Sequence, residues 1–168
     1  GVTGVQTCAL PICCSNLEHA SGCFVNLTMN SDSGEMWRAV LESIAYEYLG
    51  QVDRIRANGI GIDRVIITEG GSKSALWNQI KADVLDAKTL TLQTSGGAVM
   101  ADALVAAYAV GDIVDLKQAV MDRIAIKDVY EPNAKNTAYY RKAFNAQQEL
   151  LREKMTDAFE SLEALRNL

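Results

Sequence analysis

The sequence predicts an α/β domain in which helices cover a sheet. Two short runs that contain β-branched residues, at 63–68 and 88–94, are each followed by a stretch with apolar residues at helical spacing. Strand and helix patterns that alternate in this way are typical of one sheet with helices packed against it. The chain has 168 residues, which is enough for a single domain with a buried core.

Composition and charge exclude several classes of partner. The formal net charge is −5, whereas nucleic-acid phosphates require a basic surface, so we expect no nucleic-acid partner. No apolar run approaches the roughly 20 residues that span a bilayer, and the start of the chain lacks a signal-peptide pattern. We therefore expect a cytoplasmic protein that does not bind membranes. We also expect no metal site, because His19 has no partner at zinc-ligand spacing and Cys13 and Cys14 are adjacent.

Residues 2–12, "VTGVQTCALPI", fit neither a helical nor a strand period. Read as codons, they resemble the in-frame translation of a common short-read sequencing adapter at every position. We therefore expect residues 1–14 to be a non-native or disordered segment, and residues 15–168 to form the domain. The alternative is a genuine, disordered N-terminus. Amplification of the source DNA across the codons for Ile12 and Cys13 would decide between them.

The first half of the domain contains one strand pattern and one long helical pattern. Residues 20–30 alternate apolar and polar side chains, which predicts a strand. Asp32 and Glu35 have the spacing of a capping box, and apolar residues then recur every four positions. This pattern predicts a long helix that Asn58 and Gly59 end.

The second half predicts a series of shorter elements. We expect a buried strand at 63–68, a helix at 74–85, a second strand at 88–94, an alanine-rich helix at 98–111, a modest helix at 112–124, an edge strand before Pro132 and a C-terminal helix within 133–168. Gly70 and Gly71 separate the buried strand from the helix that follows it.

The junction "ITEGGSKSALWNQIKADVL" places a glycine turn between a strand and a helix start. Glycine lacks a Cβ, so the backbone can adopt positive φ and a flat ligand can approach closely. A helix N-terminus also presents unpaired N–H groups, and Ser72 or Ser74 is a suitable N-cap. The spacing matches neither a Walker loop nor a G-x-G-x-x-G fingerprint. Local chemistry alone therefore favours a structural turn over a ligand site.

The same residues carry a resemblance to a known family. "GGSKSALWNQIKADVL" resembles the adenosine-binding motif in the C-terminal domain of FGGY-family carbohydrate kinases, the xylulokinase-like group. Three further stretches, "ASGCFVNLTMNSDSGEMWRAVLESIAYEY", "GGAVMADALVAAYAVG" and "VYEPNAKNTAYYRKAFNAQQELL", are similar to the same domain in the same order. The resemblance covers residues 18–168. It implies an actin-like, ribonuclease H-like ATPase fold, as the C-terminal half of a two-domain sugar kinase.

The resemblance implies a nucleotide site at the glycine turn. Carried over by position, Gly70, Gly71 and Ser72 line the adenine and ribose pocket. Ser74 and Asn78 add polar contacts at its edge. No catalytic residue is expected in this chain, because the family's catalytic base is an aspartate of the N-terminal domain.

The resemblance also implies the reaction and its partners. The whole protein would use ATP with Mg²⁺, held mainly by the phosphates and the N-terminal domain, to phosphorylate a hydroxyl of a ketose or polyol. ATP or ADP and the sugar would be its partners, and a homodimer of the whole protein is compatible with the family. This chain alone is expected to be inactive. Glu69 stands where the family usually has glycine, and Ala101 stands where many relatives have glycine. The alternative function is a non-enzymatic interaction module that binds no nucleotide. Arg38 and Glu42 are interpreted as structural residues that fix the long helix.

Overall fold

The structure is a computed structural model that describes residues 6–8, 22–68, 70–93 and 97–166. Its strands are β1 (Gln6–Cys8), β2 (Cys23–Val25), β3 (Arg64–Ile67), β4 (Lys88–Leu92) and β5 (Ile126–Tyr130). Its helices are α1 (Ser33–Ala57), α2 (Ala75–Leu85), α3 (Gly97–Ala109), α4 (Leu116–Met121), α5 (Ala134–Glu149) and α6 (Thr156–Arg166). A 3₁₀ turn occupies Gly70–Ser72, and a π-helical segment occupies Leu150–Lys154.

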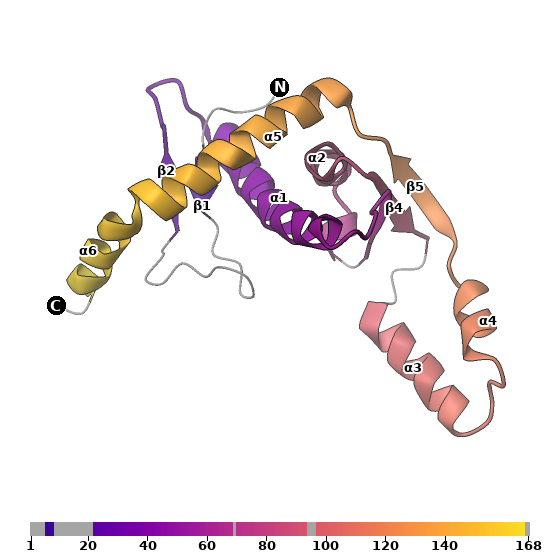
Figure 1. The fold of residues 1–168 in the computed structure, drawn as a ribbon. Helices are drawn as coiled ribbons and strands as arrows, with labels where there is room; N and C mark the ends of the chain where they lie inside the picture. Colours follow the sequence, from indigo (N-terminus) through magenta and orange to yellow (C-terminus); the bar gives the residue numbers. More distant parts are fainter. Residues whose placement is uncertain (1–5, 9–21, 69, 94–96, 167–168) are drawn as a thin grey trace.

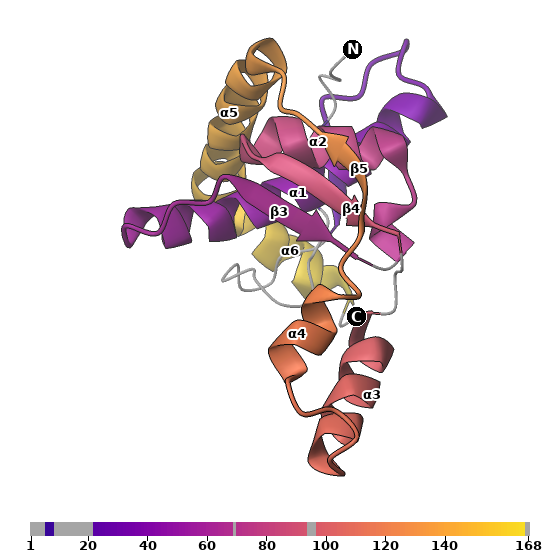
Figure 2. The same cartoon turned by 90° about the vertical axis from the view of Figure 1, so that its right-hand side faces the viewer.

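A three-stranded sheet in the order β3-β4-β5 forms the centre of the domain, with β3 parallel and β5 antiparallel to β4. Figure 2 shows the strands with α1 and α2 against one face. The central strand β4 is buried at Thr89, Leu90 and Thr91. The α/β class, the second strand and the edge strand before Pro132 are therefore confirmed.

Strand β3 was expected to be buried, and this prediction was wrong. Its residues alternate between exposed and half-buried: Val65 and Ile67 are half-buried, while Ile66 retains 47% of its accessible surface. The physical reason is that β3 lies at the end of the sheet, with a strand neighbour on one side only. A run of apolar residues cannot by itself distinguish a strand buried on both faces from an edge strand.

Helix α1 begins and ends where the sequence predicted. The Asp32 side chain accepts a hydrogen bond from the Glu35 backbone N–H at 2.8 Å, and Asn58 caps the C-terminus before Gly59, whose φ is +80°. Its buried face runs along Leu41, Ala45, Leu49 and Val52. Most of the apolar residues that recur every four positions in the sequence lie beside this buried face. One of them, Tyr48, is 45% exposed.

The C-terminal segment was predicted as one helix, and the structure divides it. Helix α5 passes into the π-helical segment, and α6 starts only after Met155. Figure 1 shows α5 and the helical segment that follows it lying across α1 and beside α2. Helix α5 contributes Tyr140 and Phe144 to the main core, which also contains Leu41, Ala45, Tyr46, Leu49, Val52, Ile80, Val84, Leu85 and Ala87.

Strand β2 and the C-terminal segment share a small second cluster. Strands β1 and β2 pair antiparallel, and Leu151 and Phe159 form a buried cluster with Cys23 and Met155 packed against it. Residues 2–12 fit no strand period, yet Gln6–Cys8 of that segment form a strand. The rest of that segment, like Glu69, lies outside the described residues. Strand β2 is shorter than expected, and Asn26 follows it with a φ of 62°.

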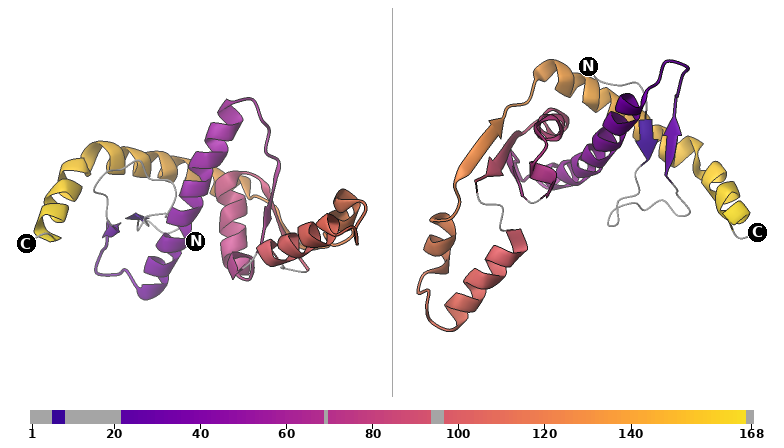
Figure 3. Two further views of the ribbon diagram at one scale, coloured as in Figure 1. Left: turned by 90° about the horizontal axis from the view of Figure 1, so that it is seen from below. Right: turned by 180° about the vertical axis from the view of Figure 1, so that it is seen from behind.

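Helices α3 and α4 extend from one end of the sheet, away from α5 and α6 (Figures 1 and 3). Both helices were expected, and Gly111, with a φ of +86°, follows the end of α3. Leu104 is the buried residue of α3. Within the described ranges, no helix combines the length and apolar character that crossing a membrane requires.

Candidate functional site

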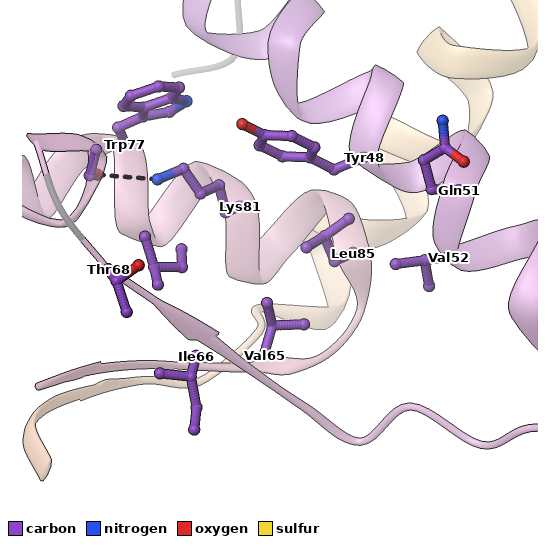
Figure 4. Close-up of a pocket in the computed structure, with 11 residues that line it drawn as sticks. Tyr48, Gln51, Val52, Val65, Ile66, Thr68, Trp77, Lys81 and Leu85 are labelled. Carbon is purple, nitrogen blue, oxygen red and sulfur yellow. Dashed lines mark hydrogen bonds between the residues drawn. The ribbon is translucent and has the colours of Figure 1, made fainter. Parts of the chain in front are cut away.

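A cavity of about 540 Å³ lies between α1, α2 and β3 (Figure 4). It is lined by Tyr48, Gln51, Val52, Val65, Ile66, Ile67, Thr68, Gly71, Trp77, Lys81 and Leu85. Most of these side chains are apolar or aromatic. The polar groups Thr68 and Lys81 lie at the end that reaches the glycine turn, and Gln51 lies at the other end. A mainly apolar cavity with a few polar groups suits a flat organic ligand.

The glycine turn and the N-terminus of α2 form one unit. Gly70–Ser72 makes a single 3₁₀ turn, and the Lys73 N–H donates to the Gly70 carbonyl at 3.3 Å. Ser74 is the N-cap, because its hydroxyl accepts from the Trp77 backbone N–H at 3.3 Å. Of the two serines that the sequence offered as caps, the structure therefore uses Ser74.

Gly71 packs closely against two side chains of α2. A Cβ at this position would lie 3.3 Å from the Trp77 ring and 3.6 Å from the Lys81 ammonium nitrogen. Gly71 does not have the positive φ that the sequence argument allowed for; Gly59, Gly97 and Gly111 do. A Cβ at Gly70 would meet no atom within 4 Å, so the two glycines are not equivalent.

Asn78 lies beneath the turn. Its side chain is fully buried, and its Nδ2 donates to the Ser72 carbonyl at 2.7 Å. The amide thus supports the turn from the α2 side, and a direct contact between Asn78 and a ligand stays a prediction. Of the five residues predicted for the site, Gly71 lines the cavity, while Gly70, Ser72 and Ser74 lie along the adjoining turn.

Lys81 is a site residue that the sequence argument missed. Its Nζ donates to the Gly71 carbonyl at 2.9 Å and lies 3.9 Å from the centre of the Trp77 ring. Lys81 is 3% exposed, and burial lowers its pKa to about 8 from 10.5. The unfolded chain binds this proton more tightly, so the ammonium form costs stability at neutral pH, and the cost disappears as pH rises from about 8 to 10.5. Helical spacing from Trp77 and Asn78 was the signal that could have revealed it.

Two buried carboxylates hold the elements around the site. Asp83 of α2 accepts from the Asn133 N–H, from Asn136 Nδ2 and from Gln79 Nε2, each at 2.8 Å. It thereby joins α2 to the start of α5.

Glu42 of α1 accepts from Arg38 Nε at 2.8 Å and from the Tyr140 hydroxyl at 3.0 Å. Arg38 Nη2 also donates to the Tyr140 hydroxyl at 3.0 Å. The three side chains thus hydrogen-bond to one another and join α1 to α5. They agree with the structural interpretation of Arg38 and Glu42.

Comparison with known proteins gives a consistent result. The model of the C-terminal domain of the FGGY family of carbohydrate kinases matches residues 14–110, which is more than half of this chain. A xylulose kinase from Staphylococcus epidermidis is 27% identical over 124 residues, which make up 74% of this chain and 25% of the relative. The chain thus spans about a quarter of the length of the curated relatives it matches.

Solved structures show the same likeness. The structure of ligand-bound xylulose kinase from Lactobacillus acidophilus matches with a TM-score of 0.73 and 26% identity, over 86% of this chain and 29% of that one. Plasmodium falciparum glycerol kinase with ADP matches with a TM-score of 0.71 over 91% of this chain and 32% of that one, and at 19% identity it shows the fold alone. The actin-like fold predicted from the sequence is confirmed.

Proposed function

This chain belongs to the FGGY family of carbohydrate kinases, whose C-terminal domain it carries, and from this premise we propose that it is the adenosine-binding half of an ATP-dependent sugar kinase. The whole protein would transfer the γ-phosphoryl group of ATP to a hydroxyl of a ketose or polyol. The relatives support this substrate class, since xylulose kinases are among them. The family match does not favour an interaction module without nucleotide binding.

The observation that carries the proposal is the glycine turn at one end of the cavity. Gly71 brings bare backbone to the cavity surface, and the adjoining walls are apolar and aromatic. An adenosine group needs such a surface, because its flat base packs on apolar walls while backbone groups supply its hydrogen bonds. We assign Gly70, Gly71 and Ser72 to the adenine and ribose contacts, with Ser74 and Asn78 beside them.

Phosphoryl transfer also needs groups that this chain is not proposed to supply. Within the described residues, no group of three or more His, Cys, Asp or Glu side chains could hold a metal ion. The proposed Mg²⁺ would be held mainly by the nucleotide phosphates and by an N-terminal domain of the whole protein, which would also hold the sugar and the catalytic base. We propose a cytoplasmic location for the whole protein.

Replacing Gly71 with arginine tests the proposed site. The new side chain would begin against the Trp77 ring and cross the surface that receives the nucleotide, so ADP affinity should fall by at least about tenfold. Isothermal titration of the purified chain with ADP measures the change.

The matched control is Gly61→Arg, which adds the same charge and bulk in the exposed loop before β3. It should bind ADP as the parent does. If ADP binding is measurable and Gly71→Arg leaves it unaltered, the nucleotide site has been assigned to the wrong surface.

A further inference from the structure

Two buried side chains of α2 hold two consecutive carbonyl groups of the glycine turn. Lys81 Nζ donates to the Gly71 carbonyl at 2.9 Å, and Asn78 Nδ2 donates to the Ser72 carbonyl at 2.7 Å. Lys81 and Asn78 are three residues apart on the helix, so they face the turn from the same side. The turn is therefore attached to α2 at two adjacent peptide groups.

This attachment sets the direction of the turn's backbone groups. The N–H and C=O of a trans peptide point in opposite directions, and no cis peptide occurs among the described residues. The Gly71 carbonyl points to Lys81 and the Ser72 carbonyl points to Asn78, so both peptide groups are fixed from the α2 side. The backbone of the turn is thereby held where Gly71 borders the cavity.

We propose that Lys81 and Asn78 are positioning residues for the nucleotide, which fix the Gly70–Ser72 turn in the orientation that receives it. This inference rests on the proposed nucleotide-binding function. Neither residue is required to touch the nucleotide, since both act through the carbonyl groups that they hold.

Lys81 is an unexpected residue for a purely structural role. An ammonium group at 3% exposure is costly, and an apolar side chain of similar length would fill the same space without that cost. Its charge is directed to one carbonyl and one ring, Gly71 and Trp77. A hydrogen bond from a charged donor is stronger than one from a neutral donor, so the protonated form holds the turn best.

The proposal predicts a pH dependence of nucleotide affinity. The pKa of Lys81 is lowered to about 8 by burial, so ADP should bind more weakly as pH rises through this value. Tyr48 of α1 is the other titratable side chain among the described residues that line the cavity. The lining residues Thr68, which follows β3, and Gly71, in the turn, are uncharged. A phosphate monoester loses its second proton near pH 6, so the phosphates of ADP are largely ionised from pH 7 to 9.5.

Trp77 provides a spectroscopic probe of the same contact that requires no nucleotide. The chain has two tryptophans, and Trp37 is 63% exposed on α1, so Trp37→Phe leaves Trp77 as the sole emitter. Loss of the proton from Lys81 should change Trp77 emission with a midpoint near pH 8. Lys81→Met should abolish this step while it preserves an unbranched side chain in the cavity.

The decisive experiment measures the ADP dissociation constant of the Trp37→Phe chain at pH 7 and at pH 9.5. We expect it to rise by about tenfold over this range, and Lys81→Met should show the weaker value at both pH values. Lys117→Met on α4, an exposed position, is the matched control and should keep the parental profile. Lys81→Arg, whose charge persists at pH 9.5, should keep much of the affinity and lose the pH dependence.

The outcomes separate the inference from the function on which it rests. If Lys81→Met binds ADP with the parental affinity and pH profile, the positioning role is wrong, while Gly71→Arg still tests the nucleotide site. If the Trp77 emission step persists in Lys81→Met, the assigned contact is wrong. If the parent chain binds no ADP at either pH, the proposed function fails and the positioning role fails with it.

Discussion

Replacing Asp83 with alanine should lower the free energy of unfolding by about 3 kcal/mol. Asp83 is 2% exposed and accepts hydrogen bonds from three donors, at Asn133, Asn136 and Gln79. Alanine would remove the acceptor of the Asn133 N–H and of Asn136 Nδ2, while Gln79 Nε2 would keep the Glu131 carbonyl, and it would open a small cavity between α2 and the start of α5. The cost of unpaired buried donors exceeds the small net gain of an ordinary hydrogen bond, which is why the expected effect is large.

Urea denaturation of the two chains measures this difference. Asp102→Ala is the matched control, because Asp102 is an exposed aspartate on α3, and its replacement should change stability by no more than about 0.5 kcal/mol. An Asp83→Ala chain as stable as the control would show that α5 is not held to α2 through this carboxylate.

The second large effect is expected at Glu42. Glu42→Ala should cost about 3 kcal/mol, because it removes the acceptor of both Arg38 and the buried Tyr140 hydroxyl. Burial raises the pKa of Tyr140, so its hydroxyl stays protonated at neutral pH and donates to the carboxylate. Both helices that this network joins support the cavity, α1 directly and α5 through the core.

A double-mutant cycle with Tyr140→Phe isolates the shared part of this energy. The two substitutions should be less than additive by about 1 kcal/mol, because either one removes the same hydrogen bond. Glu160→Ala, at an exposed position on α6, controls for the replacement of glutamate by alanine in a helix. Strict additivity would contradict the proposed coupling between α1 and α5.

The fold was predictable wherever local chemistry determines structure. Asp32, Asn58 and Gly59 set the ends of α1 through capping groups that the sequence displays. The exposure of Ile66 was not predictable, because it depends on the place of β3 at the end of the sheet. The division of the C-terminal helix at Met155 has no proline or glycine signal in the sequence.

The site was predictable only in part, because some of its contacts also depend on the tertiary arrangement. The glycine turn was visible as a motif, and a Cβ at Gly71 would lie close to the Trp77 ring six residues further on. Asn78 was predicted as a ligand contact from its place near the motif, and that contact stays a prediction. The structure places both Asn78 and Lys81 beneath the turn, where they donate to backbone carbonyls. Helical spacing could have placed Lys81 beside Asn78, but the carbonyl groups to which they donate cannot be identified from the sequence.

The most direct test of the central claim is an ADP titration of the ¹⁵N-labelled chain, followed through its amide resonances. If the chain is the adenosine-binding half of a sugar kinase, the amides of Gly70, Gly71 and Ser72 should shift in a saturable manner, together with the indole N–H of Trp77, which donates to the Leu41 carbonyl beside the cavity. If these resonances stay in place at millimolar ADP while the chain remains folded, the glycine turn of this chain is not a nucleotide site.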